Sequence, residues 1–292
     1  MGLRIAITGA NGQLGQTLLR SSLCEQHTLL PLEREALDIR DAAAVSTTLD
    51  ALSPEVIINA AAYTAVDAAE SHEAEAFALN GDGVRHLAQW AAGRQARLIH
   101  VSTDFVFDGR QHRPYRVDDA VAPLSVYGKS KLAGEQALTH LLPECGVILR
   151  TAWLYSPYRQ NFVKTMLRLM RERESLGVVD DQVGTPTSTA GLVSCLQALV
   201  EAGHARGVYH WTDAGVASWY DFAVAIQEEA LALGVLDNAI PIRPIATEQY
   251  PTPAVRPPYS VLDKSRALEE LHCPQVHWRV ALRDVLKHLS EF

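Results

Sequence analysis

The chain has 292 residues, of which 48% are hydrophobic and 21% charged, and its formal net charge at pH 7 is −8. This composition excludes a disordered chain and predicts one large domain or two unequal ones with a substantial core. The negative charge argues against a nucleic acid or a membrane surface as a partner, because both favour basic patches.

The sequence also bears on compartment and metal content. Arg4 and Thr8 interrupt the N-terminal apolar run, and no stretch reaches the ~20 apolar residues of a membrane-spanning helix. The four cysteines are widely spaced without a C-x-x-C pair, as expected in a reducing cytoplasm. His272, Cys273 and His277 lack the second cysteine group of a typical zinc site. We therefore expect a cytoplasmic protein without a bound metal.

The first predicted element is a strand over Leu3–Thr8, followed by Gly9, Gly12 and Gly15 and by a helical pattern that opens at Leu14. Gly9 would permit a tight turn, Gly12 would let backbone N–H groups approach a pyrophosphate, and Gly15 would let the helix pack closely. The phosphates would lie at the positive end of the helix. We interpret this stretch as the first βα unit of a nucleotide-binding sheet, rather than as a turn in which glycine merely relieves strain.

The second predicted strand, Leu29–Leu32, is followed directly by Glu33 and Arg34. An acidic residue at this place usually accepts from the adenosine ribose hydroxyls, whereas an arginine accommodates a 2′-phosphate. Because the chain carries both, the choice between the two cofactors stays open, and so does the alternative that either residue belongs to a simple polar loop.

A helix over Ala42–Leu52 and a buried strand over Val56–Asn59 are predicted next. Small residues follow that strand at 60–62, as a backbone lying against a flat cofactor requires. Asn80 interrupts the apolar stripe of the following helix, which indicates a buried hydrogen bond. The strand over 97–104 ends in hydroxyl side chains, at the sheet edge where open α/β folds bind ligands.

Strand and helix patterns alternate six times up to Arg150, which predicts a parallel doubly wound sheet over residues 1–150. From Thr151 the alternation loosens. We expect helices over 162–170, 192–200 and from Ser218 to about 233, short strands at 178–179 and 208–211, and a last helix near the C-terminus. The proline-rich passage 241–258 excludes regular helix and interior strand. Residues 151–292 should form mainly a smaller α/β substrate lobe, with some segments returning to the first domain.

The candidate chemistry centres on Tyr127 and Lys131, which are four residues apart at a helix start and therefore share one face. A lysine ammonium held near the phenol would lower the tyrosine pKa from its usual value of about 10. The pair could then pass a proton to a carbonyl oxygen while a nicotinamide exchanges hydride with the carbon. Thr103 or Ser102 would complete the site by hydrogen-bonding the same oxygen.

These motifs resemble the extended short-chain dehydrogenase/reductases: the three glycines, residues 102–109 and Tyr127-Gly128-x-x-Lys131. Residues 59–70, 181–187 and 250–257 narrow the resemblance to the dTDP-4-dehydrorhamnose reductases, over nearly the whole chain. The resemblance implies a Rossmann-type α/β fold and NADPH as the cofactor, with NADH also accepted. It further implies a dTDP-sugar substrate, whose 4-keto group is reduced to give dTDP-L-rhamnose.

The same resemblance implies the roles of individual residues. Thr103, Tyr127 and Lys131 would be catalytic, with Tyr127 as the proton donor. The expected cofactor-binding residues are Gly9, Asn11, Gly12, Gln13, Leu14, Arg34, Asp38, Ile39, Ala61, Ala62, Tyr63, Tyr127 and Lys131. The expected substrate-binding residues are Val66, Thr103, Asp104, Phe105, Tyr127, Trp153 and Arg256. Trp153 would pack on the sugar unless it is a core tryptophan, and Arg256 would bind the diphosphate unless it is a surface arginine.

One departure from the family pattern concerns Mg²⁺, which some members bind at a dimer contact through acidic residues after the third glycine and after the Pro-Thr pair. Here those neighbourhoods read Gln16-Thr17 and Ser188–Gly191, without a carboxylate. We therefore do not expect bound Mg²⁺, and we expect a monomer or a weak dimer.

Two alternatives remain. An epimerase or dehydratase on the same scaffold is disfavoured by Asp104-Phe105, where dehydratases usually have Asp-Glu. A non-catalytic regulatory subunit is disfavoured because Thr103, Tyr127 and Lys131 are all present.

Overall fold

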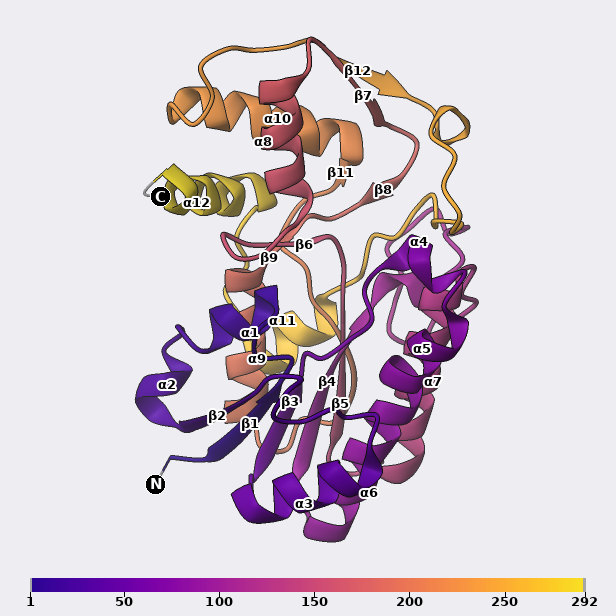
Figure 1. Cartoon of the computed structure of the whole chain (residues 1–292), viewed down its shortest axis with the longest axis vertical. Helices are drawn as coiled ribbons and strands as arrows, with labels where there is room; N and C mark the ends of the chain where they lie inside the picture. The colour runs from indigo at the N-terminus through magenta and orange to yellow at the C-terminus, as the bar shows by residue number, and fades with distance from the viewer. Residues whose placement is uncertain (1, 291–292) are drawn as a thin grey trace.

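The central sheet of the computed structural model, which describes residues 2–290, has six strands in the order β10-β5-β4-β3-β1-β2. All neighbouring strands are parallel. Their bounds are β1 Arg4–Thr8, β2 Thr28–Leu32, β3 Val56–Asn59, β4 Arg97–Thr103, β5 Gly146–Thr151 and β10 Gly207–His210. The central strands are apolar runs because helices cover both faces of the sheet. The predicted Rossmann-type doubly wound sheet is confirmed (Figure 1).

The prediction of six strand–helix alternations up to Arg150 is wrong, because only five strands of the described chain precede residue 152. The sixth strand of the sheet, β10, comes from the C-terminal part of the chain and pairs with β5. A strand that joins a sheet from so far along the chain cannot be placed from local periodicity.

Two sets of helices enclose the sheet (Figure 1). One apolar cluster joins β1, β3 and β5 to helices on one face: α1 Gln13–Leu18, α2 Leu23–Gln26, α9 Thr189–Glu201 and α11 Ser265–Leu271. The other cluster packs against α3 Ala42–Leu52, α6 Gly83–Arg94 and α7 Val126–Leu141. Short helices α4 Val66–Ala69 and α5 Glu73–Phe77, and the single turn η2 Asp104–Val106, lie near the start of α7.

Asn80 lies in a π-helical turn, η1 Ala78–Asp82, between α5 and α6. Its side chain is fully buried. The π-helical turn interrupts the helix that the sequence predicted over this stretch. Asn80 Oδ1 accepts from Tyr63 N at 2.8 Å, while Nδ2 donates to Tyr63 O at 3.1 Å and to Ser130 Oγ at 3.0 Å. The hydrogen bond that the sequence indicated therefore fixes the chain after β3 against α7.

A smaller lobe lies beyond the carboxyl ends of the strands (Figure 1). Its core joins α8 Phe162–Glu172, α10 Trp219–Ala232 and α12 Trp278–Ser290. Short strand pairs complete it: β6 Leu154–Tyr155 with β9 Thr187–Ser188, β7 Leu176–Val179 with β12 Ile242–Ile245, and β8 Val183–Gly184 with β11 Ala217–Ser218. Helix α10 begins, as predicted, directly after Ser218, which forms a capping box with Asp221.

The proline-rich passage contains β12, whose one strand partner is β7, and the single turn η3 Thr247–Gln249. Pro244 is tolerated because a two-stranded ribbon leaves one edge without a ladder partner. Between residues 2 and 290, no helix combines the length and the apolar character that crossing a bilayer demands.

Candidate active site

The glycine turn lies where the strand order reverses, since β1 has β2 on one side and β3 on the other. This switch point is where doubly wound sheets bind ligands. Gly9 has a φ of +69°, and a Cβ there would lie 2.7 Å from Ala61 N. A Cβ on Gly15 would lie 2.5 Å from Gly9 O. Positions 9 and 15 therefore accept only glycine. No side chain caps the first N–H groups of α1, so these groups can bind a pyrophosphate.

A pocket of about 320 Å³ extends from this turn over the end of β3. Eight predicted cofactor residues line it: Gly9, Gly12, Arg34, Asp38, Ile39, Ala61, Ala62 and Tyr63. Ala60, one of the small residues that the sequence places against a flat cofactor, also lines it, and the sequence reasoning missed Leu37, Arg40, Glu75 and Leu79. The size and lining fit the adenosine half of a dinucleotide, so the residues present can hold such a cofactor.

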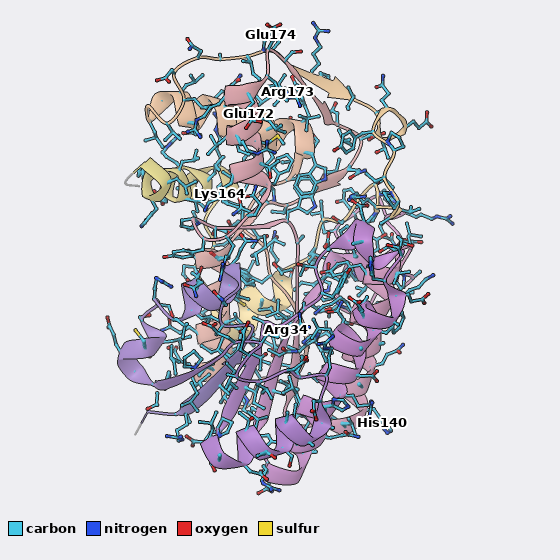
Figure 2. All side chains as sticks on the ribbon, viewed as in Figure 1. Arg34, His140, Lys164, Glu172, Arg173 and Glu174 are labelled. Atoms are coloured by element: carbon cyan, nitrogen blue, oxygen red, sulfur yellow. The ribbon has the colours of Figure 1, made fainter. Side chains whose placement is uncertain are left out.

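Charged side chains at the pocket are arranged around Asp38. Arg40 Nε donates to Asp38 Oδ1 at 2.9 Å, and this contact lowers the pKa of the Asp38 carboxyl to about 2. Arg34 Nε lies 3.9 Å from Asp38, and its side chain is 73% exposed; Figure 2 shows it near the centre of the view. Glu33 is not part of the lining; its Oε2 accepts from Asn11 Nδ2 at 3.3 Å.

The remaining predicted residues of the glycine turn contact the C-terminal lobe or the core. Gln13 Oε1 accepts from Ser156 Oγ at 3.0 Å and from Asn161 Nδ2 at 3.1 Å. Arg159 Nε donates to Asn11 O at 2.7 Å. Leu14 is buried in the core beneath the sheet. The loop 156–161 therefore fastens the lobe to the glycine turn, a link that no sequence motif indicated.

Helix α7 carries the candidate catalytic pair. Its start is fixed by Ser125, which caps Gly128 N, and by Glu70, whose Oε1 accepts from Val126 N at 2.9 Å. The ring of Phe105 packs edge-on against Tyr127 with centroids 5.5 Å apart. The first turn of the helix is thus held rigidly at the carboxyl end of β4.

The structure brings Thr103 and Tyr127 together, but it corrects the expected pKa of the phenol. Burial raises the pKa of Tyr127 to about 12; a hydrogen bond with Thr103 lowers it, and the Asp104 carboxylate raises it. The prediction that Lys131 depresses this pKa is wrong in this structure. Lys131 Nζ instead donates to Val101 O at 2.7 Å and lies 3.2 Å from His100 Nε2.

Lys131 and Asp104 are both titratable groups buried in this region. Lys131 is 2% exposed, and burial lowers its pKa to about 7 although Glu135 raises it. Burial raises the pKa of Asp104 to about 6, while hydrogen bonds with Ser260 and Thr103 lower it. Perturbed pKa values of this kind gather at functional sites.

The predicted substrate residues around the lobe boundary are already engaged with protein partners. Trp153 has a φ of +48° and stacks on Trp219 with centroids 3.5 Å apart. Arg256 Nη2 donates to Asp67 Oδ2 at 2.8 Å, and its Nη1 donates to Thr252 Oγ1 at 2.6 Å. Val66 begins α4, directly before Asp67. Their roles toward a sugar diphosphate stay predictions.

The segments Gln16-Thr17 and Ser188–Gly191, which lack the carboxylates that some family members carry there, lie in contact in the structure. Thr17 Oγ1 donates to Thr189 Oγ1 at 2.8 Å, which joins α1 to α9. Within residues 2–290 there is no cluster of three or more histidine, cysteine, aspartate or glutamate side chains suited to a metal ion.

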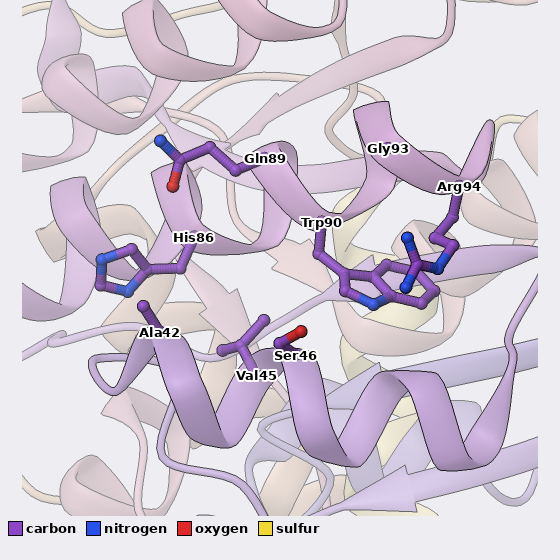
Figure 3. Close-up of a pocket in the computed structure, with 8 residues that line it drawn as sticks. All are labelled: Ala42, Val45, Ser46, His86, Gln89, Trp90, Gly93 and Arg94. Carbon is purple, nitrogen blue, oxygen red and sulfur yellow. The ribbon is translucent and has the colours of Figure 1, made fainter.

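Another hollow, of about 270 Å³, lies between α3 and α6 (Figure 3). Trp90 Nε1 donates to Asp50 at 2.8 Å beside it, and Arg94 pairs with the same carboxylate. None of the predicted site residues lines this hollow: its lining is Ala42, Val45, Ser46, His86, Gln89, Trp90, Gly93 and Arg94. This hollow therefore gives no support to a role in the candidate site.

Comparison with known proteins gives a consistent result. Residues 3–291 match the family model described as the RmlD substrate binding domain. The chain is 43% identical over 288 residues to a dTDP-4-dehydrorhamnose reductase of Aggregatibacter actinomycetemcomitans, covering 97% of this chain and 98% of that protein.

Two solved structures are similarly close. A dTDP-4-dehydrorhamnose reductase from Clostridium acetobutylicum has a TM-score of 0.92 and 39% identity, covering 99% of this chain and all of that one. A dTDP-4-dehydrorhamnose reductase from Bacillus anthracis in complex with NADP has a TM-score of 0.91 and 36% identity, covering 98% and 99%. Similarity on this scale extends over both lobes.

Proposed function

The chain belongs to the RmlD substrate binding domain family, and we propose that it reduces the 4-keto group of dTDP-4-dehydro-6-deoxy-L-mannose to give dTDP-L-rhamnose, with NADPH as reductant. The full-length similarity to dTDP-4-dehydrorhamnose reductases carries the substrate class. The juxtaposition of Thr103 and Tyr127 beside a dinucleotide pocket supports the reaction type.

NADPH, when bound, supplies the hydride for this reduction. Gly9, Gly12 and the N-terminus of α1 would hold its pyrophosphate, and Arg34, Asp38 and Ile39 its adenosine end. The protein's own chemistry is proton transfer. Tyr127 donates its phenolic proton to the ketone oxygen as negative charge develops there, and Thr103 hydrogen-bonds the same oxygen.

The direct test of this function is an assay with purified protein, NADPH and the dTDP-4-keto-6-deoxy sugar. Absorbance of NADPH should fall only when the sugar is present, and the product should be dTDP-L-rhamnose. Unchanged absorbance with authentic substrate, in protein that binds NADPH, would refute the reductase assignment.

We also propose the finer aspects that the sequence suggested: a cytoplasmic location and a monomer or weak dimer. The location is supported by Cys24, Cys145, Cys195 and Cys273, which are free thiols, since disulfides are rare in reducing compartments. The oligomeric proposal rests on the absence of carboxylates at Thr17 and Ala190.

The first prediction concerns cofactor preference. Arg34→Ala is expected to raise KM for NADPH about fivefold to tenfold and to leave KM for NADH nearly unchanged. A charge-assisted contact to a 2′-phosphate contributes about 1.5–3 kcal/mol, which the exposure of Arg34 and the neighbouring Asp38 reduce. Steady-state kinetics with both cofactors measures the difference.

Arg173→Ala is the matched control, because that exposed arginine lies at the far end of the C-terminal lobe (Figure 2). Equal changes with NADPH and NADH in Arg34→Ala would show that this guanidinium does not face the 2′ position.

The second prediction concerns divalent metal. Dialysis against EDTA is expected to leave kcat unchanged, because the Thr17–Thr189 contact offers hydroxyls where Mg²⁺ usually needs one or two carboxylates. The measurement is kcat before and after dialysis, with and without added Mg²⁺. A loss that Mg²⁺ specifically restores would contradict the prediction.

A further inference from the structure

A line of buried polar side chains crosses the sheet from the glycine turn to Lys131. Thr8 at the end of β1, Asn59 at the end of β3 and His100 in β4 are each at most 1% exposed. Thr8 Oγ1 lies 2.6 Å from Asn59 Oδ1, Asn59 Nδ2 lies 3.0 Å from His100 Nδ1, and His100 Nε2 lies 3.2 Å from Lys131 Nζ. Buried polar side chains in a sheet core are costly unless every donor meets an acceptor.

The orientation of this line is set by a backbone group. Ala61 N, which can only donate, lies 3.2 Å from Asn59 Oδ1, so this oxygen accepts both from Ala61 and from the Thr8 hydroxyl. The other end of the amide, Nδ2, is therefore a donor directed at His100 Nδ1. Consequently Nδ1 of His100 must accept and carries no proton.

A neutral imidazole whose Nδ1 accepts has its single proton on Nε2. That N–H faces Lys131 Nζ, which also donates to Val101 O at 2.7 Å. A neutral amine can donate to Val101 and accept from His100 through its lone pair. An ammonium has no lone pair, so its N–H groups would face the His100 N–H with no acceptor between the two nitrogens.

The charged groups around Lys131 do not reverse this preference. Glu135, one turn along α7, favours the ammonium, but its carboxylate accepts from Arg150 Nη2 at 2.7 Å and from Ser102 Oγ at 2.5 Å. Burial raises the pKa of Tyr127 to about 12 and that of Asp104 to about 6. Burial lowers the pKa of His100 well below its usual value, so the imidazole is neutral, and burial also lowers that of Lys131.

We propose that His100, oriented by Asn59, is a positioning residue for Lys131: its Nε2–H stabilises the neutral amine and so makes the Lys131 ammonium a readier proton donor to Tyr127. After Tyr127 has given its proton to the ketone oxygen, the Lys131 ammonium would supply the proton that restores the phenol, and the resulting amine accepts from His100. Solvent then returns a proton to the amine. This inference rests on the catalytic role that the family resemblance implies for Lys131, but the hydrogen-bond pattern from Asn59 to Lys131 exists without turnover.

The first test is the tautomer of His100 in the unmodified protein, read from ¹⁵N NMR of ring-labelled histidine. The His100 signals are assigned by their loss in His100→Leu. We expect proton-bearing Nε2 and unprotonated Nδ1 at neutral pH. A proton on Nδ1, or an imidazolium, would overturn the proposal, and this result needs no active enzyme and no variant beyond the assignment.

The second test reverses the direction of the hydrogen bonds that run from residue 59 through His100 to Lys131. In Asn59→Asp both carboxylate oxygens accept, so His100 should move its proton to Nδ1 and present Nε2 as an acceptor to the ammonium. We expect the proton affinity of Lys131 to rise at least about tenfold, one pKa unit. The measurement is ¹³Cε-lysine NMR against pH, in a chain whose lysines are Lys129, Lys131, Lys164, Lys264 and Lys287.

The added negative charge is separated from the tautomer change by a double-mutant cycle. Asn59→Asp introduced into a His100→Leu background should raise the proton affinity of Lys131 by much less than it does in the wild type. An equal rise in both backgrounds would show a purely coulombic effect and would contradict the relay.

A kinetic readout links the relay to turnover. The rate of the wild type is expected to fall as pH rises through about 7, where Lys131 loses the ammonium that protonates Tyr127. Asn59→Asp should move that fall to higher pH. A structural role alone would lower the rate without moving the profile. If the protein proves inactive on the dTDP sugar, the NMR tests still decide the hydrogen-bond assignment.

Discussion

Tyr127→Phe is expected to lower kcat by about 10²- to 10⁴-fold, the usual contribution of a placed acid, while the Kd for NADPH barely changes. The substitution removes only the phenolic oxygen, and the ring keeps its edge-on packing against Phe105. Because burial raises the pKa of Tyr127 to about 12, the phenol stays protonated over the working pH range and remains available as an acid. Single-turnover kinetics and fluorescence titration with NADPH separate the two quantities.

Two further substitutions bracket this effect. Thr103→Val should be milder, because it removes one hydrogen bond of about 1–3 kcal/mol. Lys131→Ala should harm both kcat and cofactor affinity, since Lys131 is among both the expected catalytic and the expected cofactor-binding residues. If Tyr127→Phe keeps a near-normal kcat, the acid lies elsewhere in the site.

Arg150→Met is expected to lower the free energy of unfolding by about 3–5 kcal/mol, because it leaves a buried carboxylate without its partner. Arg150 and Glu135 side chains are 5% and 3% exposed and form a bidentate pair, with Nε donating to Oε1 at 2.9 Å and Nη2 to Oε2 at 2.7 Å. This ion pair joins β5 to α7 beneath the catalytic pair. Urea denaturation followed by circular dichroism measures the loss.

The double variant Glu135→Gln, Arg150→Met should recover part of the loss, because both charges are then removed. Arg168→Met is the matched control: its pair with Glu172 is about half exposed, and its loss should cost less than about 1 kcal/mol. A cost for Arg150→Met as small as that of Arg168→Met would show that the buried pair contributes nothing special.

Local spacing was sufficient to predict the parts of the site that lie within one element. The glycine turn and the Tyr127–Lys131 pair each occupy a few consecutive residues, so the 3.6-residue helical period and the needs of a tight turn reveal them. The same reasoning identified Asn80 from one polar residue in an apolar stripe, although it did not reveal the π-helical turn that accommodates it.

Contacts between distant segments were beyond this reasoning. His100 and Asn59 are 41 residues apart, and Gln13 and Asn161 are 148 residues apart, so strand order and lobe packing decide that they meet. Arg40 follows Asp38 in the sequence, but only the fold turns its guanidinium toward the pocket. The direction of the Tyr127 pKa shift was wrong because spacing reveals a neighbouring lysine and does not reveal burial.

The most direct test of the proposed reduction follows a deuterium label from NADPH into the product. With NADPH deuterated at the transferable position of the nicotinamide ring and the dTDP-4-keto-6-deoxy sugar, the label should appear at C4 of the sugar in dTDP-L-rhamnose. Each product molecule should carry one deuterium, and one NADPH should be oxidised for each product molecule formed. A sugar product that forms without net oxidation of NADPH, or that carries the label at another carbon, would contradict reduction at C4 and favour an epimerase or dehydratase.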